Sequence, residues 1–539
     1  MISLKTLPTR SKAMLIHFRF FLEEFEDDCE FGLEALMYLA VGRRLLEGDE
    51  ELACLFHEYL LNLNFFISLL VQHSNQFGFE QFQKITSSNL RNYSEESYRR
   101  QFLQLIGDIG RETRYIEGRF SPKDSVGGIG ILLKKIIDGW NSSRTCVSHE
   151  CQLALIGHFI KRKDTEAPFF QYRFQSYYSN LEKRVKAFAV FHKESKVSDL
   201  FLKNNVSIVG VDAAGSEFDT PPFVFAPFFR ELRRQGVSHF TFHAGEDSYS
   251  IISGLRAIYE AIEFCELKRG DRIGHASAAG MNPDQYYEKN SPLPIVEYLD
   301  DLVFLYAFIV EHKIDALYSQ IPQLAEKIHR ACFKIYEKDY PIPCLIDAWK
   351  LRKYHPLLVF SETQPPEDAF FYNEEEYITC QILCHYTTEE KCHNTVFEIF
   401  ASYHDMNNRK RLRNIFEYSN NLLTSESIRN IQKAILKVMH SREIVIETLP
   451  TSNIMIGPYS SISDYHLWTW LRWEQEGNCI PPIVLGTDDP GIFSTNIQTE
   501  YARLYCHMVY EMNYPHKEAI SILSRFENNA RIYQFAEHS

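Results

Sequence analysis

Several features that would mark a secreted, membrane or nucleic-acid-binding protein are missing from this sequence. No apolar run is long enough to cross a membrane, since the longest, 60–71, contains Asn62 and Asn64. The first residues do not resemble a signal peptide, because Arg19 and a run of Glu interrupt the apolar segment. The 12 cysteines are scattered and lack a secretory context, which favours reduced thiols and a cytoplasmic location.

An excess of positive charge is missing as well. The chain has 57 Lys and Arg against 71 Asp and Glu, a formal net charge of −14. This balance argues against bulk binding to nucleic acid or to an anionic membrane, while it leaves room for a local basic pocket for one phosphate. What is present, 45% hydrophobic and 24% charged residues in 539, is typical of a soluble globular protein with more than one structural unit.

Apolar runs that end in polar or Gly-containing turns predict buried parallel strands. They are 113–122, 151–159, 206–217, 238–246, 271–277, 443–453 and 481–490. Helical patterns such as 222–235 and 250–267 lie between most of them. Alternating strands and helices, with polar residues gathered where the strands end, predict a βα barrel whose active-site face is formed by those strand ends.

The alternation stops between Asp271 and Glu443, where long helical patterns (295–336 and 374–403) flank a Pro-rich region of predicted turns. The first hundred residues also predict helices, at 33–47, 51–72 and 95–111. The expected organisation has four parts. These are a helical N-terminal region (1–110), the first part of the barrel (111–285), a helical insertion (286–440), and the last strands with C-terminal helices (441–539).

Three predicted strand ends carry residues suited to one metal-dependent site. His243 and Asp488 are chemically suitable ligands for a borderline metal such as zinc, which lowers the pKa of bound water. Glu246 would donate a proton if burial raises its pKa, and His275 would either orient a hydroxide or take its proton. Asp489 would accept a hydrogen bond from a substrate, or it simply caps the following helix.

The fragments "FHAGE", "DRIGHA", "ETLPTSN" and "GTDDP", together with "YIEGRFSP" and "VGVDAAGSE", resemble the ordered motifs of the adenosine deaminase family of metal-dependent amidohydrolases. The likeness covers roughly residues 110–285 and 440–500. It implies a TIM-like (β/α)8 barrel and the zinc-dependent hydrolytic deamination of adenosine, or a related adenine nucleoside or nucleotide, to the inosine product and ammonia. Its implied residues are His243 and Asp488 for the metal, Glu246 and His275 for catalysis, and Gly215 and Asp489 for the substrate.

One departure from that family concerns the metal. The first strand of the family carries a His-x-His pair, and no such pair exists in this chain. The nearest candidate is His17, with Arg19 in place of the second histidine. The first strand is therefore divergent, missing, or lost because the chain is truncated. A catalytically impaired barrel that acts as an assembly or regulatory subunit is the alternative function.

The large insertion and the many aromatic residues also suggest a homo-oligomer with a partner protein in a larger assembly. In build the chain is similar to enlarged adenosine deaminase-like proteins of bacterial anti-phage defence. Two further features are interpreted as structural rather than as ligand-binding sites. For "VGGIGILLKK" (126–135) we expect a flexible loop rather than a phosphate site, and the Cys/His group at 380–393 is expected to be core rather than a second zinc site. The cytidine-deaminase signature is absent.

Overall fold

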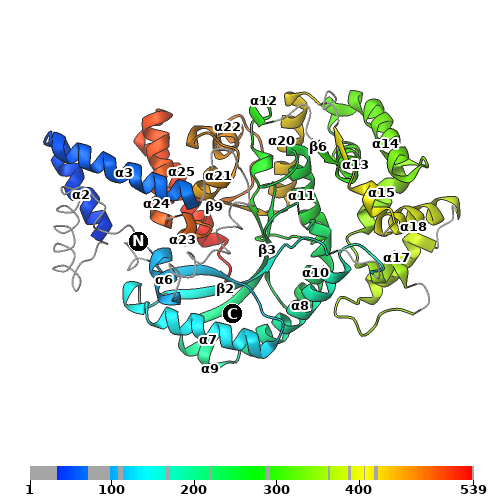
Figure 1. Cartoon of the computed structure of the whole chain (residues 1–539), viewed down its shortest axis with the longest axis horizontal. Helices are drawn as coiled ribbons and strands as arrows, with labels where there is room; N and C mark the ends of the chain where they lie inside the picture. Colours follow the sequence, from blue (N-terminus) through cyan, green and yellow to red (C-terminus); the bar gives the residue numbers. More distant parts are fainter. Residues whose placement is uncertain are drawn as a thin grey trace.

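Seven parallel strands, in the order β1-β2-β3-β4-β5-β8-β9, form the sheet at the centre of the molecule (Figure 1). All seven predicted strands are confirmed, as β1 (Tyr115–Phe120), β2 (Gln152–Ile160), β3 (Val206–Ala214), β4 (His239–Ala244), β5 (Arg272–His275), β8 (Val445–Thr448) and β9 (Ile483–Leu485). The computed structural model describes residues 33–70, 97–106, 113–165, 170–218, 220–286, 292–361, 364–385, 390–405, 407–417, 423–493 and 495–536. Within those residues β9 and β1 are edge strands that do not pair with each other.

Helices connect successive strands and cover the outer face of the sheet, as in an α/β barrel. The strands are apolar along most of their length because helices bury them from outside. These helices are α7 (Val126–Asn141), α8 (Gln175–Ser195), α9 (Asp199–Lys203), α10 (Ala226–Arg234), α11 (Ile251–Phe264), α20 (Ser425–Ser441), α21 (Pro450–Ile456), α22 (Leu467–Gln475), α23 (Pro490–Phe493), α24 (Ile497–Cys506) and α25 (His516–Ile532).

The predicted flexible loop at 126–135 is wrong. The segment is the first part of helix α7, whose N-cap Ser125 accepts a hydrogen bond from the backbone N–H of Gly128. Apolar side chains at helical spacing, including Ile129 and Leu133, are fully buried. This packing outweighs the low helix propensity of the three glycines in the segment.

The insertion leaves the barrel after β5 and returns through α20 to β8, which pairs directly with β5. It begins with the one-turn helix α12 (Pro283–Tyr286), and its two short strands are β6 (Pro292–Pro294) and β7 (Ile415–Glu417). Between these strands lie its main helices, α13 (Ile295–Glu311), α14 (Ile321–Tyr336), α15 (Ile342–Leu351), α16 (Pro356–Phe360), α17 (Glu374–His385), α18 (Glu390–His404) and α19 (Arg409–Leu412). Arg256 on α11 fixes the insertion by pairing with Asp301 at 2.8 Å and with Glu297. Arg230 on α10 does the same through Glu376, at 2.9 Å.

The Pro-rich region predicted as turns contains helices α15 and α16 instead. Pro343 and Pro356 lie in the first turns of these helices, where a missing N–H costs nothing because the first helical N–H groups have no partner within the helix.

In the N-terminal part the predicted helices are present as α2 (Leu33–Leu46), α3 (Glu50–Leu70) and α6 (Tyr98–Ile106). His17 lies outside the described residues. None of the described helices combines the length and apolar character needed to span a membrane.

Charged side chains, rather than the usual aliphatic layers, fill the interior of the sheet. Arg272 pairs with Glu117 (Nη2–Oε1 2.9 Å) and approaches Glu447 (3.7 Å). Glu447 accepts a bond from Arg119 at 2.7 Å, and Arg119 Nε donates to Asp212 at 2.8 Å. All of these but Arg119 and Glu117 are at least nine-tenths buried, so the chain of alternating charges compensates their desolvation and leads toward the strand ends.

The C-terminal segment lies across the opposite end of the sheet. The Phe535 ring stacks on His239 (4.6 Å between centroids) and beneath the guanidinium of Arg272 (3.8 Å). Its backbone N–H donates to Glu117 at 2.9 Å, and its carbonyl accepts from the Tyr115 hydroxyl. The last described residues therefore close the N-terminal ends of β1, β4 and β5.

Candidate active site

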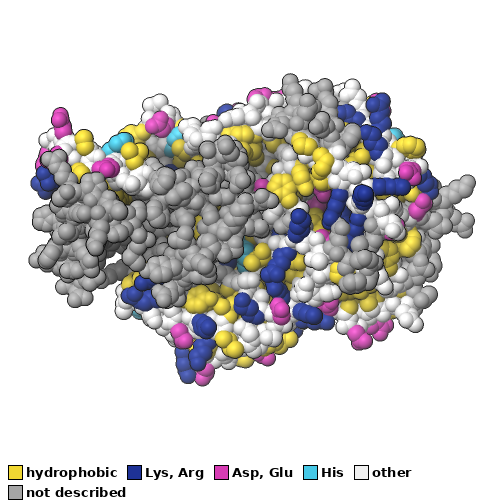
Figure 2. All heavy atoms as spheres, in the orientation of Figure 1, with side chains coloured by type: hydrophobic (Ala, Val, Ile, Leu, Met, Phe, Trp, Pro, Cys, Tyr) yellow, Lys and Arg dark blue, Asp and Glu magenta, His cyan; other side chains and the backbone are white. Residues whose placement is uncertain are grey.

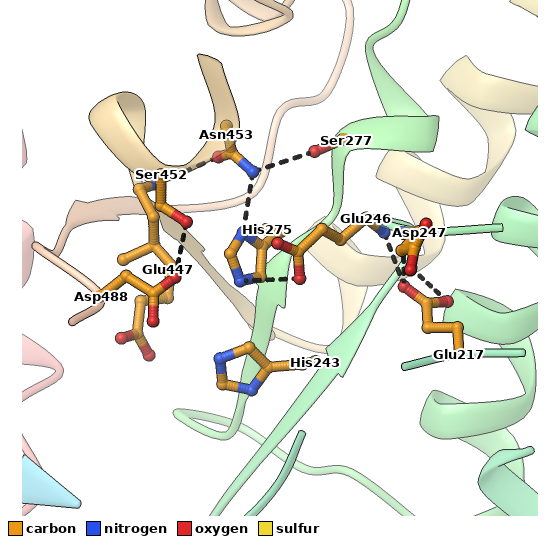
Figure 3. A network of polar contacts seen from close by, with 12 residues as sticks. Glu217, His243, Glu246, Asp247, His275, Ser277, Glu447, Ser452, Asn453 and Asp488 are labelled. Carbon is orange, nitrogen blue, oxygen red and sulfur yellow. Dashed lines mark hydrogen bonds and ion pairs between the residues drawn. The ribbon is translucent and has the colours of Figure 1, made fainter. Parts of the chain in front are cut away.

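The residues predicted from the strand ends lie together on one rim of the sheet (Figure 3). His243 is the second-last residue of β4 and His275 is the last residue of β5. Glu246 follows β4 in the turn, and Asp488 follows β9. Their side chains share this rim because parallel strands bring their carboxyl ends to the same face.

His243 is held by a buried carboxylate. Its Nδ1 donates to Oδ1 of Asp212 at 2.9 Å, and Asp212 on β3 is fully buried. Burial alone would raise the pKa of Asp212, but His243 and Arg119, with a further hydrogen bond from His158, hold that pKa well below its usual range. An ionised Asp212 fixes the proton of His243 on Nδ1, so Nε2 is left as a lone-pair donor.

His275 and Glu246 form a buried pair, with 3.1 Å between Nε2 and Oε2. The side-chain amide nitrogen of Asn453 lies 2.7 Å from Nδ1 of His275, and the amide oxygen of Asn453 accepts a bond from the Tyr465 hydroxyl. The amide nitrogen therefore donates to Nδ1, which places the proton of the neutral ring on Nε2, facing Glu246. Burial, followed by the neighbouring His243, lowers the pKa of His275 well below its usual range.

Glu246 has the electrostatic character of an acid. Burial raises the pKa of its carboxyl well above the usual value, and the nearby carboxylates of Asp488 and Glu217 raise it further. Lys161 acts in the opposite direction. The raised pKa favours the protonated form of Glu246, which is the form that carries a transferable proton.

The turn that presents Glu246 is fixed by Glu217. The carboxylate of Glu217 accepts hydrogen bonds from three successive backbone N–H groups, those of Gly245 (2.9 Å), Glu246 (2.7 Å) and Asp247 (3.2 Å). Gly245 has φ +79°, and a Cβ there would lie 2.7 Å from Cδ1 of Ile258. Only glycine fits this position, which explains the Gly of "HAGE".

A single lysine lies among these acidic groups. Lys161, directly after β2, is 2% exposed and donates from Nζ to the backbone carbonyl of His243 at 2.7 Å. Burial lowers the pKa of Lys161, whereas Glu217, Glu246 and Asp212 oppose that shift. Lys161 thus joins the end of β2 to the end of β4.

Asp488 is half-buried, and its Oδ2 accepts a hydrogen bond from Ser452 at 2.5 Å. Burial raises the pKa of Asp488, and the bond from Ser452 together with His243 counteracts the rise. Asp488 and His275 both have left-handed backbone conformations, with φ +57° and +65°. Non-glycine residues rarely adopt this conformation, and such strain concentrates where side chains must be aimed for function.

The two predicted substrate contacts have different surroundings. Asp489 accepts a bond from the backbone N–H of Ile492 at 3.1 Å, so it does cap the short helix α23. Gly215, with φ +117°, ends β3 against the backbone of Lys161, where a Cβ would lie 3.3 Å from the Lys161 nitrogen. Their contact with a substrate stays a prediction.

The donor atoms fit a divalent metal in kind but fall short in number. His243 has the carboxylate-oriented ring that metal-ligating histidines need, and Asp488 supplies a carboxylate on the same rim. Among the described residues, however, no group of three or more His, Cys, Asp and Glu side chains could hold a metal ion. Cys380 and Cys384 of the predicted core group are fully buried, whereas the side chains of His385, Cys392 and His393 lie outside the described residues.

Several site residues carried no role in the sequence-based prediction. Asp212, Glu217 and Asn453 lie inside the motifs "VGVDAAGSE" and "ETLPTSN", so their positions were visible although their contacts were not. Lys161 lies outside every motif. Its signal is a lysine immediately after an apolar strand, which occurs too often by chance to point to a site.

Comparison with known proteins adds a general likeness. No protein-family model and no curated protein matches this chain. Among solved structures, the apo N6-methyl-AMP deaminase from Arabidopsis thaliana is 15% identical, with 85% of this chain and 78% of that chain covered and a TM-score of 0.37. Arabidopsis ADAL complexed with IMP is 14% identical, with 90% and 87% covered and a TM-score of 0.40.

An amidohydrolase from Burkhoderia ambifaria with bound Zn is 12% identical, with 88% of this chain and 73% of that chain covered and a TM-score of 0.37. All three TM-scores lie below 0.5, so these likenesses assign neither an activity nor a metal to this chain. The fold follows from its strand order, and the chemistry follows from the residues at its rim.

Proposed function

We propose that this chain is a hydrolytic deaminase that converts an adenine nucleoside or nucleotide to its inosine counterpart and ammonia. The buried pair of Glu246 and His275, on the same rim as His243 and Asp488, is the observation that supports the proposal. In this reaction a water oxygen bonds to C6 of the ring, the ring nitrogen N1 gains a proton, and the C6–N6 bond breaks to release ammonia.

Glu246 supplies the proton. Burial and the neighbouring carboxylates raise the pKa of its carboxyl, which favours the protonated form, and Glu217 holds the backbone of its turn in place. The transfer to N1 leaves a carboxylate close to Lys161, whose positive charge stabilises the ionised form. One proton of the attacking water then restores the Glu246 carboxyl, and the other leaves with the amino group as ammonia.

His275 acts as a hydrogen-bond donor. Because Asn453 donates to Nδ1, the ring proton is on Nε2 and points into the site. This tautomer favours orientation of the attacking oxygen over removal of its proton, the two roles that the sequence left open.

His243 and Asp488 are the residues that would hold a zinc ion, with Asp212 behind His243. When bound there, zinc would lower the pKa of a coordinated water toward neutrality. Since the described residues offer fewer than three ligands, metal content is itself part of the test.

The test is a product assay with purified protein. Adenosine, AMP, ADP, ATP and an adenine-containing oligonucleotide are each incubated, and ammonia and the inosine product are measured. We expect at least one substrate to be converted by the native chain and not by Glu246→Gln, whereas Glu263→Gln on the exterior of α11 keeps full activity. No conversion of any substrate by protein that contains one zinc per chain would overturn the proposal.

A second candidate is an assembly or regulatory subunit with an impaired barrel. The missing three-ligand group within the described residues favours it. Protein that is folded, free of metal and inactive on all five substrates, even after zinc is added, would select this candidate.

A further inference from the structure

Three consecutive residues in the first turn of helix α21 each bond to a different part of the molecule around the rim. Thr451, Ser452 and Asn453 are 2%, 0% and 1% exposed. Ser452 donates to Oδ2 of Asp488 at 2.5 Å. The side-chain amide of Asn453 donates to Nδ1 of His275 at 2.7 Å, and both contacts are visible in Figure 3. Two of the predicted site residues are therefore oriented by neighbouring positions of one short turn.

Thr451, the first of the three, is held by Glu500 of helix α24. Its backbone N–H donates to Oε2 of Glu500 at 3.0 Å, and its hydroxyl donates to Oε1 at 2.5 Å. This N–H lies in the first turn of α21, where the helix itself offers no acceptor, so it needs a partner from elsewhere. The hydroxyl also accepts a bond from Arg503 at 2.9 Å, which leaves its proton for Glu500. Both polar groups of Thr451 thus depend on one carboxylate.

Glu500 also holds the segment that follows Asp488. Its Oε1 accepts a second hydrogen bond, from the hydroxyl of Thr495, which lies two residues after the end of α23. The side chain of Glu500 is fully buried, so these three bonds offset the cost of removing a carboxylate from water. A neutral carboxamide has only one acceptor oxygen and cannot receive all three. The turn after β8 and the segment after β9 are consequently joined through Glu500.

We propose that Glu500 is a positioning residue, which through Thr451 keeps the next two side chains aimed at Asp488 and His275. Its effect on catalysis rests on the proposed deaminase function. Because its carboxylate is fully buried and bonded to the turn, Glu500 acts through the turn and not on the substrate. A turn that shifts by about 1 Å no longer lets Asn453 fix the ring proton of His275 on Nε2, and a misplacement of that size can cost roughly 100-fold in rate.

The test compares variants of this contact with a variant of another buried glutamate. Glu500→Leu removes the acceptor of all three bonds, whereas Thr451→Val removes only the hydroxyl bond of Thr451. Thr451→Ser keeps both bonds and is the conservative variant. Glu260→Leu is the control, because Glu260 is 1% exposed and accepts a bond from Trp349 of the insertion at 2.8 Å.

Three quantities are measured on each purified full-length variant. Amide hydrogen exchange is followed on peptides that cover residues 449–453 and 245–247, and this measurement needs no substrate. Steady-state kinetics gives kcat and KM, per folded protein, on the substrate that the native chain converts. The melting temperature (Tm) reports the loss of global stability.

We expect Glu500→Leu to accelerate exchange at 449–453 by at least about 10-fold and to leave 245–247 unchanged. Its kcat should fall by about 10- to 100-fold with KM within about threefold of the native value, since the residues that it positions act in the chemical step. Thr451→Val should show a smaller fall, and Thr451→Ser should stay close to the native chain. Glu260→Leu should lower Tm but keep the native kcat.

The double variant Glu500→Leu/Thr451→Val should lose no more activity than Glu500→Leu alone, because both changes break the same contact. Native exchange at 449–453 in Glu500→Leu would overturn the proposal, whether or not the native chain is active. Accelerated exchange with an unchanged kcat, or a fall in kcat no larger than that of Glu260→Leu, would overturn it as well.

Failure of the proposed function gives a different result. If the native chain converts no substrate, the deaminase proposal fails by itself, and faster exchange confined to 449–453 in Glu500→Leu still shows that Glu500 holds this turn. If Glu500→Leu does not fold, the comparison of Thr451→Val with Thr451→Ser decides the question by the same measurements.

Discussion

Asp212 and His243, on neighbouring strands β3 and β4, are joined by a hydrogen bond of 2.9 Å that connects the charged interior of the sheet to its rim. The same carboxylate accepts bonds from Arg119 at 2.8 Å and from His158 at 2.8 Å. The orientation of the His243 ring therefore depends on charges that lie deeper in the sheet.

Asp212→Asn should reduce kcat/KM and metal affinity by roughly 10- to 100-fold, because a neutral amide no longer fixes the proton of His243 on Nδ1. Steady-state kinetics and metal content measured on the same sample would check this. Asp124→Asn, on the surface beside Arg184, is the matched control. Unchanged zinc content and kinetics in Asp212→Asn would show that this hydrogen bond has no role in the site.

Glu217→Gln should lower kcat by about 10- to 100-fold, since a carboxamide oxygen cannot replace a carboxylate that accepts three backbone hydrogen bonds. Glu217 acts through the backbone of the turn, so amide hydrogen exchange at residues 245–247 should accelerate as well. A drop in kcat without faster exchange would indicate direct contact with the substrate instead.

Lys161→Met should move the alkaline limb of the pH–activity profile to higher pH. Lys161 lowers the pKa of Glu246, so its removal raises that pKa, and a general acid stays protonated up to its pKa. The activity that remains should therefore persist at a pH where the native chain has lost it. A shift in the acidic direction, or no shift, would contradict the assignment of Glu246 as the acid.

Acid stability should depend on His466, at the start of α22. Burial lowers the pKa of this ring to about 3, from 6.5 in an unfolded chain. The unfolded state then binds the proton first, so the contribution of His466 is complete above about pH 6.5 and is lost as the pH falls toward 3. His466→Gln should weaken the decline in Tm between pH 6.5 and 4, and an unaltered decline would assign it to other buried groups such as His355 or His404.

The sequence predicted all seven strands because each is an apolar run that ends in a polar or glycine-containing turn. The runs are apolar because helices cover every strand in the same way. It located the insertion because the alternation of predicted strands and helices stops between Asp271 and Glu443, and the structure pairs the flanking strands β5 and β8 directly. It misjudged the Pro-rich region, since prolines in the first turn of a helix have the same local sequence as prolines in a turn.

The site was predictable where the motif itself contains the chemistry, as for His243, Glu246, His275 and Asp488, which the structure places on one rim. The groups that orient them were not predictable. Asp212 reaches His243 from the neighbouring strand, and Asn453 reaches His275 from helix α21, so these pairings exist only after the sheet has formed. On the visible face of Figure 2, Lys and Arg side chains gather near the insertion, but no local run of sequence marks them as a group.

The position of Phe535 has a consequence for biosynthesis. Its carbonyl bonds to a tyrosine 420 residues earlier in the chain, and its ring covers Arg272 and His239. A nascent polypeptide cannot make these contacts before Phe535 has left the ribosome, so the N-terminal ends of β1, β4 and β5 stay open until then. Nonlocal contacts of this kind slow folding and expose intermediates to aggregation. Chains that stop before Phe535 should consequently depend on chaperones far more than chains that include it.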